Sequence, residues 1–233
     1  MKLINLLLLI IIPVYTFGQN RGSDCKCPVS QYSTTKADTI FYLPDGHSIA
    51  LCGAKETGII KGKKLYREFV LSVCGSDRVI KFWDAMQICN LKTYGNTLIV
   101  ETLEDLPVGK FMALKETPWT MEYIYFVNNK VVRDSVINSH LPKYNPTQIS
   151  YILNLYERLP NNSDYATSDI MDRLFIATIS GSKKSRYYLI NFEKKFTNVD
   201  GVYAERYDTI MRMLKLWDTE HPISNQPDRK DTN

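Results

Sequence analysis

The sequence predicts an α+β protein, in which an N-terminal antiparallel β half, a sandwich or barrel, precedes a C-terminal segment of four helices. Between residues 39 and 137 the chain is rich in Val, Ile, Tyr, Phe and Thr. Turn residues punctuate this stretch roughly every eight to twelve positions, which is the pattern of short antiparallel strands. After Asn138 the spacing of apolar residues changes from two to about 3.6, the period of an amphipathic helix.

About nine short strands are expected in the β half. Thr39–Leu43 and Ser48–Leu51 flank a Pro-Asp-Gly turn, which is typical of a hairpin. Phe69–Val73 is continuously apolar and predicts a buried strand, whereas Trp119–Val127 alternates. Four further segments have the composition of strands: Val79–Trp83, Gln87–Leu91, Thr97–Glu101 and Val131–Val136.

Four amphipathic helices are expected after residue 138. Asn145 followed by Pro146 is a helix start, and Pro160 ends the apolar stripe that follows. The other three are expected at about Ser168–Ser180, at Tyr188–Phe196 and at Tyr203–Trp217. Short connections between them favour antiparallel pairs that pack on each other or on the sheet.

The first 18 residues are expected to be a cleavable secretory signal peptide. Lys2 gives a positive start, and Leu6–Ile12 is an unbroken run of Leu and Ile. Thr16 and Gly18 place small residues three and one positions before a cut ahead of Gln19. The apolar run is shorter than the ~20 residues of a membrane span. We therefore expect a soluble mature protein in the periplasm or outside the cell.

These boundaries divide the chain into five parts. They are the signal peptide (1–18), an N-terminal arm (19–36), the antiparallel β domain (37–140), the helical domain (141–220) and a polar, mobile tail (221–233).

Five cysteines lie in the first half of the chain: Cys25, Cys27, Cys52, Cys74 and Cys89. Disulfides persist in exported proteins, so at least one bridge and one unpaired thiol are expected, and fifteen arrangements with two bridges are open. If Cys52 and Cys74 end two strands of one hairpin, they lie roughly 20 Å apart and cannot pair. A bridge from Cys25 or Cys27 would tether the arm. The Cys-x-Cys pair could instead be half of a metal site, but no second pair matches it.

Charge does not point to nucleic acid. Removing Lys2 with the signal lowers the formal net charge from +4 to +3, and the remaining positive charges are dispersed. The densest cluster, Lys183, Lys184 and Arg186, is expected in a turn that links two helices. The chain has no Gly-rich phosphate loop, so we predict no cofactor. Because Cys25 and Cys27 have no matching second pair and His47 has no partner nearby, we also predict no metal.

We assign no catalytic residue from the sequence. The chain has no GxSxG, HExxH or CxxC motif. Asp45 and His47 are expected to belong to a turn, in which the Asp bonds its own backbone. The remaining candidates are interpreted as loop histidines and an acidic strand end: His140, His221, Glu101, Glu104 and Asp105.

Aromatic residues are numerous in this chain, which has fifteen Tyr, nine Phe and three Trp. Trp83 and Trp119 stand at strand boundaries, where an indole can reach a rim and contact a sugar or a protein. Core packing is the commoner fate of Trp. The preference for core packing is nevertheless weaker for these two Trp residues than the preference for a structural role at the other candidates. On that ground we expect a non-catalytic binding or interaction module for a protein or glycan partner, with Trp83 and Trp119 as ligand contacts. The alternatives are a secreted hydrolase whose site is assembled from distant residues, and a secreted inhibitor or immunity-type protein.

Overall fold

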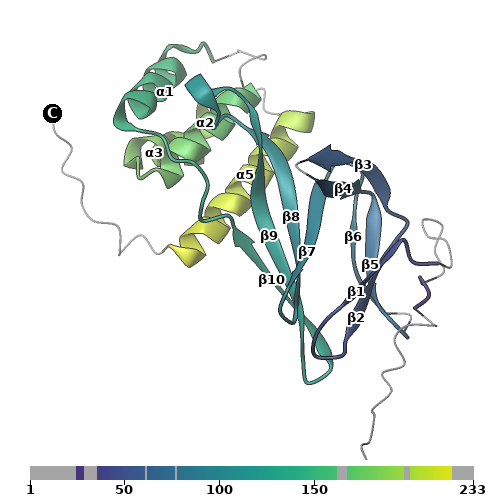
Figure 1. Ribbon diagram of the computed structural model, residues 1–233. Helices are drawn as coiled ribbons and strands as arrows, with labels where there is room; N and C mark the ends of the chain where they lie inside the picture. The colour runs from purple at the N-terminus through teal and green to yellow at the C-terminus, as the bar shows by residue number, and fades with distance from the viewer. Residues whose placement is uncertain are drawn as a thin grey trace, which may run out of the picture.

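The computed structural model of the protein describes residues 25–28, 36–60, 62–76, 78–161, 167–196 and 200–221. They form two antiparallel sheets followed by helices (Figure 1), which confirms the predicted fold class. The strands are β1 (Thr39–Tyr42), β2 (Ser48–Cys52), β3 (Lys55–Ile60), β4 (Lys63–Arg67), β5 (Phe69–Val73), β6 (Val79–Trp83), β7 (Ile88–Tyr94), β8 (Thr97–Leu106), β9 (Lys115–Val127) and β10 (Lys130–Ile137). The helices are α1 (Pro146–Arg158), α2 (Thr167–Ile179), α3 (Lys183–Ile190), α4 (Phe192–Lys195) and α5 (Gly201–Glu220).

The two sheets share one apolar core and form a sandwich. The four-stranded sheet has the order β1-β2-β5-β6, and the six-stranded sheet has the order β10-β9-β8-β7-β4-β3. A fully buried side chain of this size contributes roughly 1.5–3 kcal/mol relative to an exposed one, so this core holds the sheets together. Its buried members are Leu43, Ile49, Leu51, Phe69, Leu71, Trp83, Cys89, Leu98, Val100 and Ile124.

The β3–β4 hairpin was not predicted as a pair of strands. It leaves the four-stranded sheet after β2 and joins the far edge of the other sheet, where β4 pairs with β7. Its sequence, KETGIIKGKKLYR, is rich in lysine and contains Gly58 and Gly62. These residues are depleted in strands, so the local composition hid a hairpin that tertiary pairing stabilises.

The helices pack against the turn end of the long β8–β9 hairpin and against β10 (Figure 1). Leu106, Trp119 and Ile137 contribute from the strands to this second core, which is otherwise helical. The stripe along α5 is buried as the helical period predicts, and its buried members are Tyr207, Ile210, Leu214 and Trp217. The six-stranded sheet therefore carries two cores, one with the other sheet and one with the helices.

The helix starts and ends follow local signals, with two differences from the sequence prediction. Asn145 caps α1 in a capping box with Gln148. The expected third helix is divided at Asn191 into α3 and α4. The cluster of Lys183, Lys184 and Arg186 lies in α3, not in a linking turn, because the Ser182 side chain caps the helix just before it.

The predicted signal peptide, the cut before Gln19, much of the N-terminal arm and all of the tail after His221 lie outside the described residues. Within the part of the chain that the structure describes, each helix is too short or too polar to cross a membrane.

Candidate functional site

Trp83 and Trp119, the two expected ligand contacts, both lie in the core. Their exposed fractions are 1% and 2%. Trp83 stacks on Phe69 inside the sandwich, with 4.9 Å between ring centroids. Trp119 lies 4.7 Å beneath the Arg206 guanidinium and edge-on to Phe175. Neither indole presents a face at the surface, so the structure does not support the binding role expected for these two residues.

A β-bulge directs Trp119 toward the helices. Thr102 of β8 pairs with Thr120 of β9. The next residue, Leu103, pairs with Pro118, so the ladder skips Trp119. An extra residue of this kind bends the strand and redirects its own side chain. The alternation expected along β9 is therefore broken at the one position where the sequence suggested a ligand contact.

Two disulfides tie the N-terminal arm to the four-stranded sheet, which confirms the prediction of disulfide bonding. Cys27 is bonded to Cys52 at the end of β2, and Cys25 is bonded to Cys74 just after β5. Because β2 and β5 are antiparallel neighbours, Cys52 and Cys74 lie at opposite ends of the pair, as the sequence argument required. Cys89 is unpaired and buried. Two bridges indicate an oxidising, exported setting.

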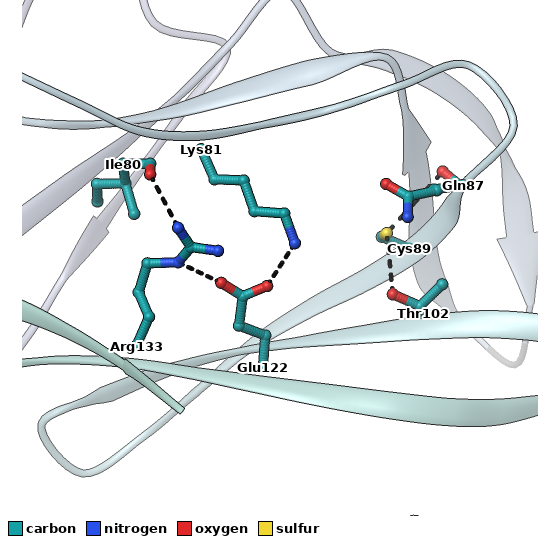
Figure 2. A network of polar contacts seen from close by, with 7 residues as sticks. All are labelled: Ile80, Lys81, Gln87, Cys89, Thr102, Glu122 and Arg133. Atoms are coloured by element: carbon teal, nitrogen blue, oxygen red, sulfur yellow. Dashed lines mark hydrogen bonds and ion pairs between the residues drawn. The ribbon is translucent and has the colours of Figure 1, made fainter. Parts of the chain in front are cut away.

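A polar network closes the side of the sandwich between β6 and β10 (Figure 2). Lys81 donates to the Glu122 carboxylate at 2.7 Å, and Arg133 donates to its other oxygen. Arg133 also donates to the carbonyl of Ile80 at 3.4 Å. Both oxygens of Glu122 are occupied by cations from the two sheets, so this carboxylate serves as a clamp and not as a free general base.

Cys89 lies beside this network (Figure 2). Its sulfur is 3.9 Å from both the Thr102 hydroxyl and the Gln87 carbonyl oxygen. Burial raises the pKa of the Cys89 thiol to about 12. Only a thiolate is an effective nucleophile, so this thiol is inert at neutral pH.

The three carboxylates expected at one strand end do not converge. Glu101 accepts a hydrogen bond from Asn90 at 2.6 Å within the six-stranded sheet. Glu104 lies 3.3 Å from Arg206 of α5, and Asp105 is exposed. A glycosidase needs two carboxyl groups at a defined separation across a substrate, and these three point to different surroundings.

His47 has a structural environment. Its backbone N–H donates to Asp45 at 3.0 Å, as a turn predicts. The ring stacks on Phe126 with 3.9 Å between centroids, and its Nε2 lies 3.2 Å from the side-chain oxygen of Asn129. The ring thus joins the β1–β2 turn to the β9–β10 hairpin. The other two histidines lie after β10 and at the end of α5: His140 and His221.

Glu104, Asp172 and Arg206 join β8 to α2 and α5. The guanidinium of Arg206 lies 2.8 Å from Asp172 and 3.3 Å from Glu104, and it covers Trp119. Burial raises the pKa of Glu104 and raises that of Asp172 to about 6, although Arg206 opposes both effects. Two carboxyls share one cation in a packed interface, so the cluster fastens helices to the sheet.

The Asp172→Asn variant is expected to lose part of the pH dependence of stability. The pKa of Asp172 in the folded protein lies above the ~3.9 of an unfolded Asp. Its contribution to the free energy of unfolding is therefore complete below about pH 3.9 and is lost as pH rises through about 6. The wild type should therefore gain about 1 kcal/mol from this group between pH 7 and pH 5. Urea unfolding at both pH values measures the gain. Asp208→Asn, a change at an exposed carboxylate of α5, is the control and should keep it. An identical pH slope in wild type and Asp172→Asn would contradict the assignment.

The β8–β9 turn, residues 107–114, exposes two large apolar side chains on a closed backbone. Phe111 at its tip is 86% exposed and Leu114 is 62% exposed. Phe111 and Met112 both have left-handed backbones, with φ of 57° and 59°. This conformation costs a bulky L-residue roughly 1–2 kcal/mol. The exposed Phe111 ring itself gains little packing energy in return for this strain, whereas the neighbouring Met112 packs against the helical core.

Backbone hydrogen bonds close the β8–β9 turn. The Gly109 N–H donates to the carbonyl of Ala113 at 2.9 Å, and the Met112 N–H donates to the carbonyl of Gly109 at 3.0 Å. A Cβ on Gly109 would lie 2.8 Å from the Ala113 oxygen, so only glycine fits there. The Tyr144 hydroxyl donates to the carbonyl of Pro107 at 2.6 Å and anchors the base.

The side chains of the β8–β9 turn divide between core and solvent. Val108 and Met112 pack against the helical core, whereas Phe111 and Leu114 face outward. Sequence reasoning missed this turn, because no periodicity marks it and its left-handed positions carry Phe and Met instead of Gly or Asn. The one local signal is Pro107 followed by Gly109, a turn pair between two strands.

Within the described residues, no group of three or more His, Cys, Asp or Glu side chains is arranged to hold a metal ion. The chain matches no protein-family model, no curated protein and no solved structure. The β8–β9 turn is therefore a candidate site on its geometry alone.

Proposed function

We propose that this chain is an exported, non-catalytic interaction protein that binds its partner through the β8–β9 turn. One observation carries the proposal: Phe111 is almost fully exposed on a left-handed backbone inside a hydrogen-bonded turn. Strain of this kind persists when function selects it, because the same position would be more stable with a residue that prefers the conformation. Export through a signal peptide cleaved before Gln19 belongs to the same proposal and agrees with the two disulfides.

The closed backbone of the turn supports binding. A loop held in its bound conformation avoids the ordering cost of association, roughly 0.5–1.5 kcal/mol for each immobilised side chain. Aromatic side chains, Phe among them, are enriched at the cores of protein interfaces. The polar groups considered for catalysis are engaged elsewhere: Glu122 and Glu101 in bonds within the sandwich, and Cys89 as a protonated thiol.

Replacing Phe111 with Asn should separate binding from stability. Asn tolerates the left-handed region better than Phe, so the free energy of unfolding is expected to rise by about 1 kcal/mol. Thermal or urea unfolding measures this rise. Immobilised wild-type protein should retain a partner from the extracytoplasmic fraction of the cells that make it. Immobilised Phe111→Asn should not retain that partner.

Tyr94→Ala is the matched control for that experiment. Tyr94 is also a highly exposed aromatic residue, 80% exposed at the β7–β8 turn, but its own backbone is not left-handed. This variant should retain the partner at the wild-type level. A lower stability of Phe111→Asn, combined with unchanged retention, would show that Phe111 has a structural role and would overturn the proposal.

A further inference from the structure

We infer that the partner of the β8–β9 turn is a folded protein with a preformed apolar pocket that receives the Phe111 ring. This inference rests on the function proposed above and names the class of partner. Three features of the turn separate a protein from a glycan or a lipid surface: the polarity of its side chains, the charges behind its tip and the closure of its backbone.

The side chains of the turn do not suit a glycan. Sugar binding uses an open aromatic face together with polar groups that bond the hydroxyls. Here the Lys110 ammonium lies 5.1 Å from the centroid of the Phe111 ring and covers one face. Lys110 is also the one polar side chain in residues 107–114, whose sequence is PVGKFMAL. The tip offers apolar contact and almost no hydrogen-bonding groups.

The charges behind the tip do not suit a lipid surface. Leu106 and Lys115 form the pair next to the turn, and Asp105 and Glu116 face each other one pair farther along β8 and β9. Lys115, Asp105 and Glu116 are all exposed. A tip that entered a bilayer would bring this carboxylate pair to the headgroups, where anionic lipids repel it and burial would desolvate it. Two cations, Lys110 in the turn and Lys115 at its base, lie in front of the two carboxylates. A protein surface can match this order of positive and then negative charge, whereas anionic lipids would attract only its first part.

The closed backbone favours a pocket that already exists. The bonds between Gly109, Met112 and Ala113 fix the direction in which Phe111 projects. Tyr144 fixes the base of the turn on the helical core. A ring presented in one orientation binds best to a site of complementary shape, since neither partner then has to order on contact.

The test places a photoreactive benzophenone amino acid at position 111 of the full-length protein, expressed and exported in its own cells. A second protein carries the same group at position 94 as the control. After irradiation, position 111 should give one saturable protein adduct, and position 94 should not give it. Unlabelled wild type and Tyr94→Ala should compete for the adduct equally well, and Phe111→Ala should compete at least 30-fold less well. Mass spectrometry should map the crosslink to a concave apolar site of the adduct.

Two further probes distinguish the classes of partner. They are vesicles of phosphatidylethanolamine and phosphatidylglycerol, and purified cell-wall glycan, each tested with wild type, Phe111→Ala and Tyr94→Ala. Binding to either probe should be absent or unchanged by Phe111→Ala. Binding to vesicles or glycan that requires Phe111 would overturn the protein partner and leave the proposed function standing. If no protein, vesicle or glycan binds in a Phe111-dependent way, both the inference and the proposed function fail.

Discussion

Replacing Trp119 with alanine is expected to lower the free energy of unfolding by about 3–5 kcal/mol, the range for truncating a buried Trp. The indole is the sheet's largest contribution to the helical core, between Arg206 and Phe175. Its loss leaves a cavity and removes the surface that supports the shared cation. Domains are stable by only about 5–15 kcal/mol, so this variant should be close to unfolding at room temperature. Urea unfolding measures the loss.

Trp119→Phe is the control, and it should cost clearly less than the alanine variant. The indole N–H has no hydrogen-bond partner among the described residues, so phenylalanine gives up volume without breaking a hydrogen bond. Both variants should leave binding through Phe111 intact wherever the protein remains folded. A cost under about 1 kcal/mol for Trp119→Ala would mean that the residue is not packed as the structure shows.

Removal of the Cys27–Cys52 bridge is expected to lower the free energy of unfolding by about 3–4 kcal/mol in the chain-entropy model, because the bridge spans a sequence separation of 25 residues. The Cys27→Ser, Cys52→Ala double variant tests it by urea unfolding. The Cys25–Cys74 bridge spans 49 residues, so its removal should cost at least as much.

Cys89 provides the matched control for the bridges. Cys89→Ala removes a buried thiol that closes no loop, so its cost should stay near 1 kcal/mol. Thiol labelling of the natively exported protein should find one cysteine that reacts after denaturation and four that react only after reduction as well. The intact mass of the same sample reports whether the chain begins at Gln19. Labelling of all five cysteines without reduction would contradict the bridges.

Much of the fold could be predicted from the sequence, because the deciding signals are local. The strands Phe69–Val73 and Val79–Trp83 have the bounds that composition indicated. The capping residue Asn145 and the stripe along α5 mark helices for the same reason. The β3–β4 hairpin could not be found in this way, since its pairing with β7 depends on a strand more than twenty residues later.

The candidate site was much less accessible to sequence reasoning. Trp119 stands in an alternating strand, but the bulge that redirects it is created by the partner strand β8 and is not visible in the residues around it. Phe111 is surrounded by apolar neighbours, and its exposure results from Val108 and Met112 entering the helical core. A left-handed Phe has no sequence signature, because intrinsic preference assigns that conformation to Gly or Asn.

The path of the chain between the two sheets sets the order in which a newly made molecule can be completed. Once Trp83 has emerged, every strand of the four-stranded sheet and all four bridged cysteines are present. The β3–β4 hairpin has emerged too, but β7 has not. At this stage the four-stranded sheet can form, whereas β4 still has an unpaired edge. Lysine and arginine along that strand, KKLYR, discourage mispairing with other chains during the wait. The composition that hides this hairpin from strand prediction is thus also expected to keep the nascent protein from aggregating.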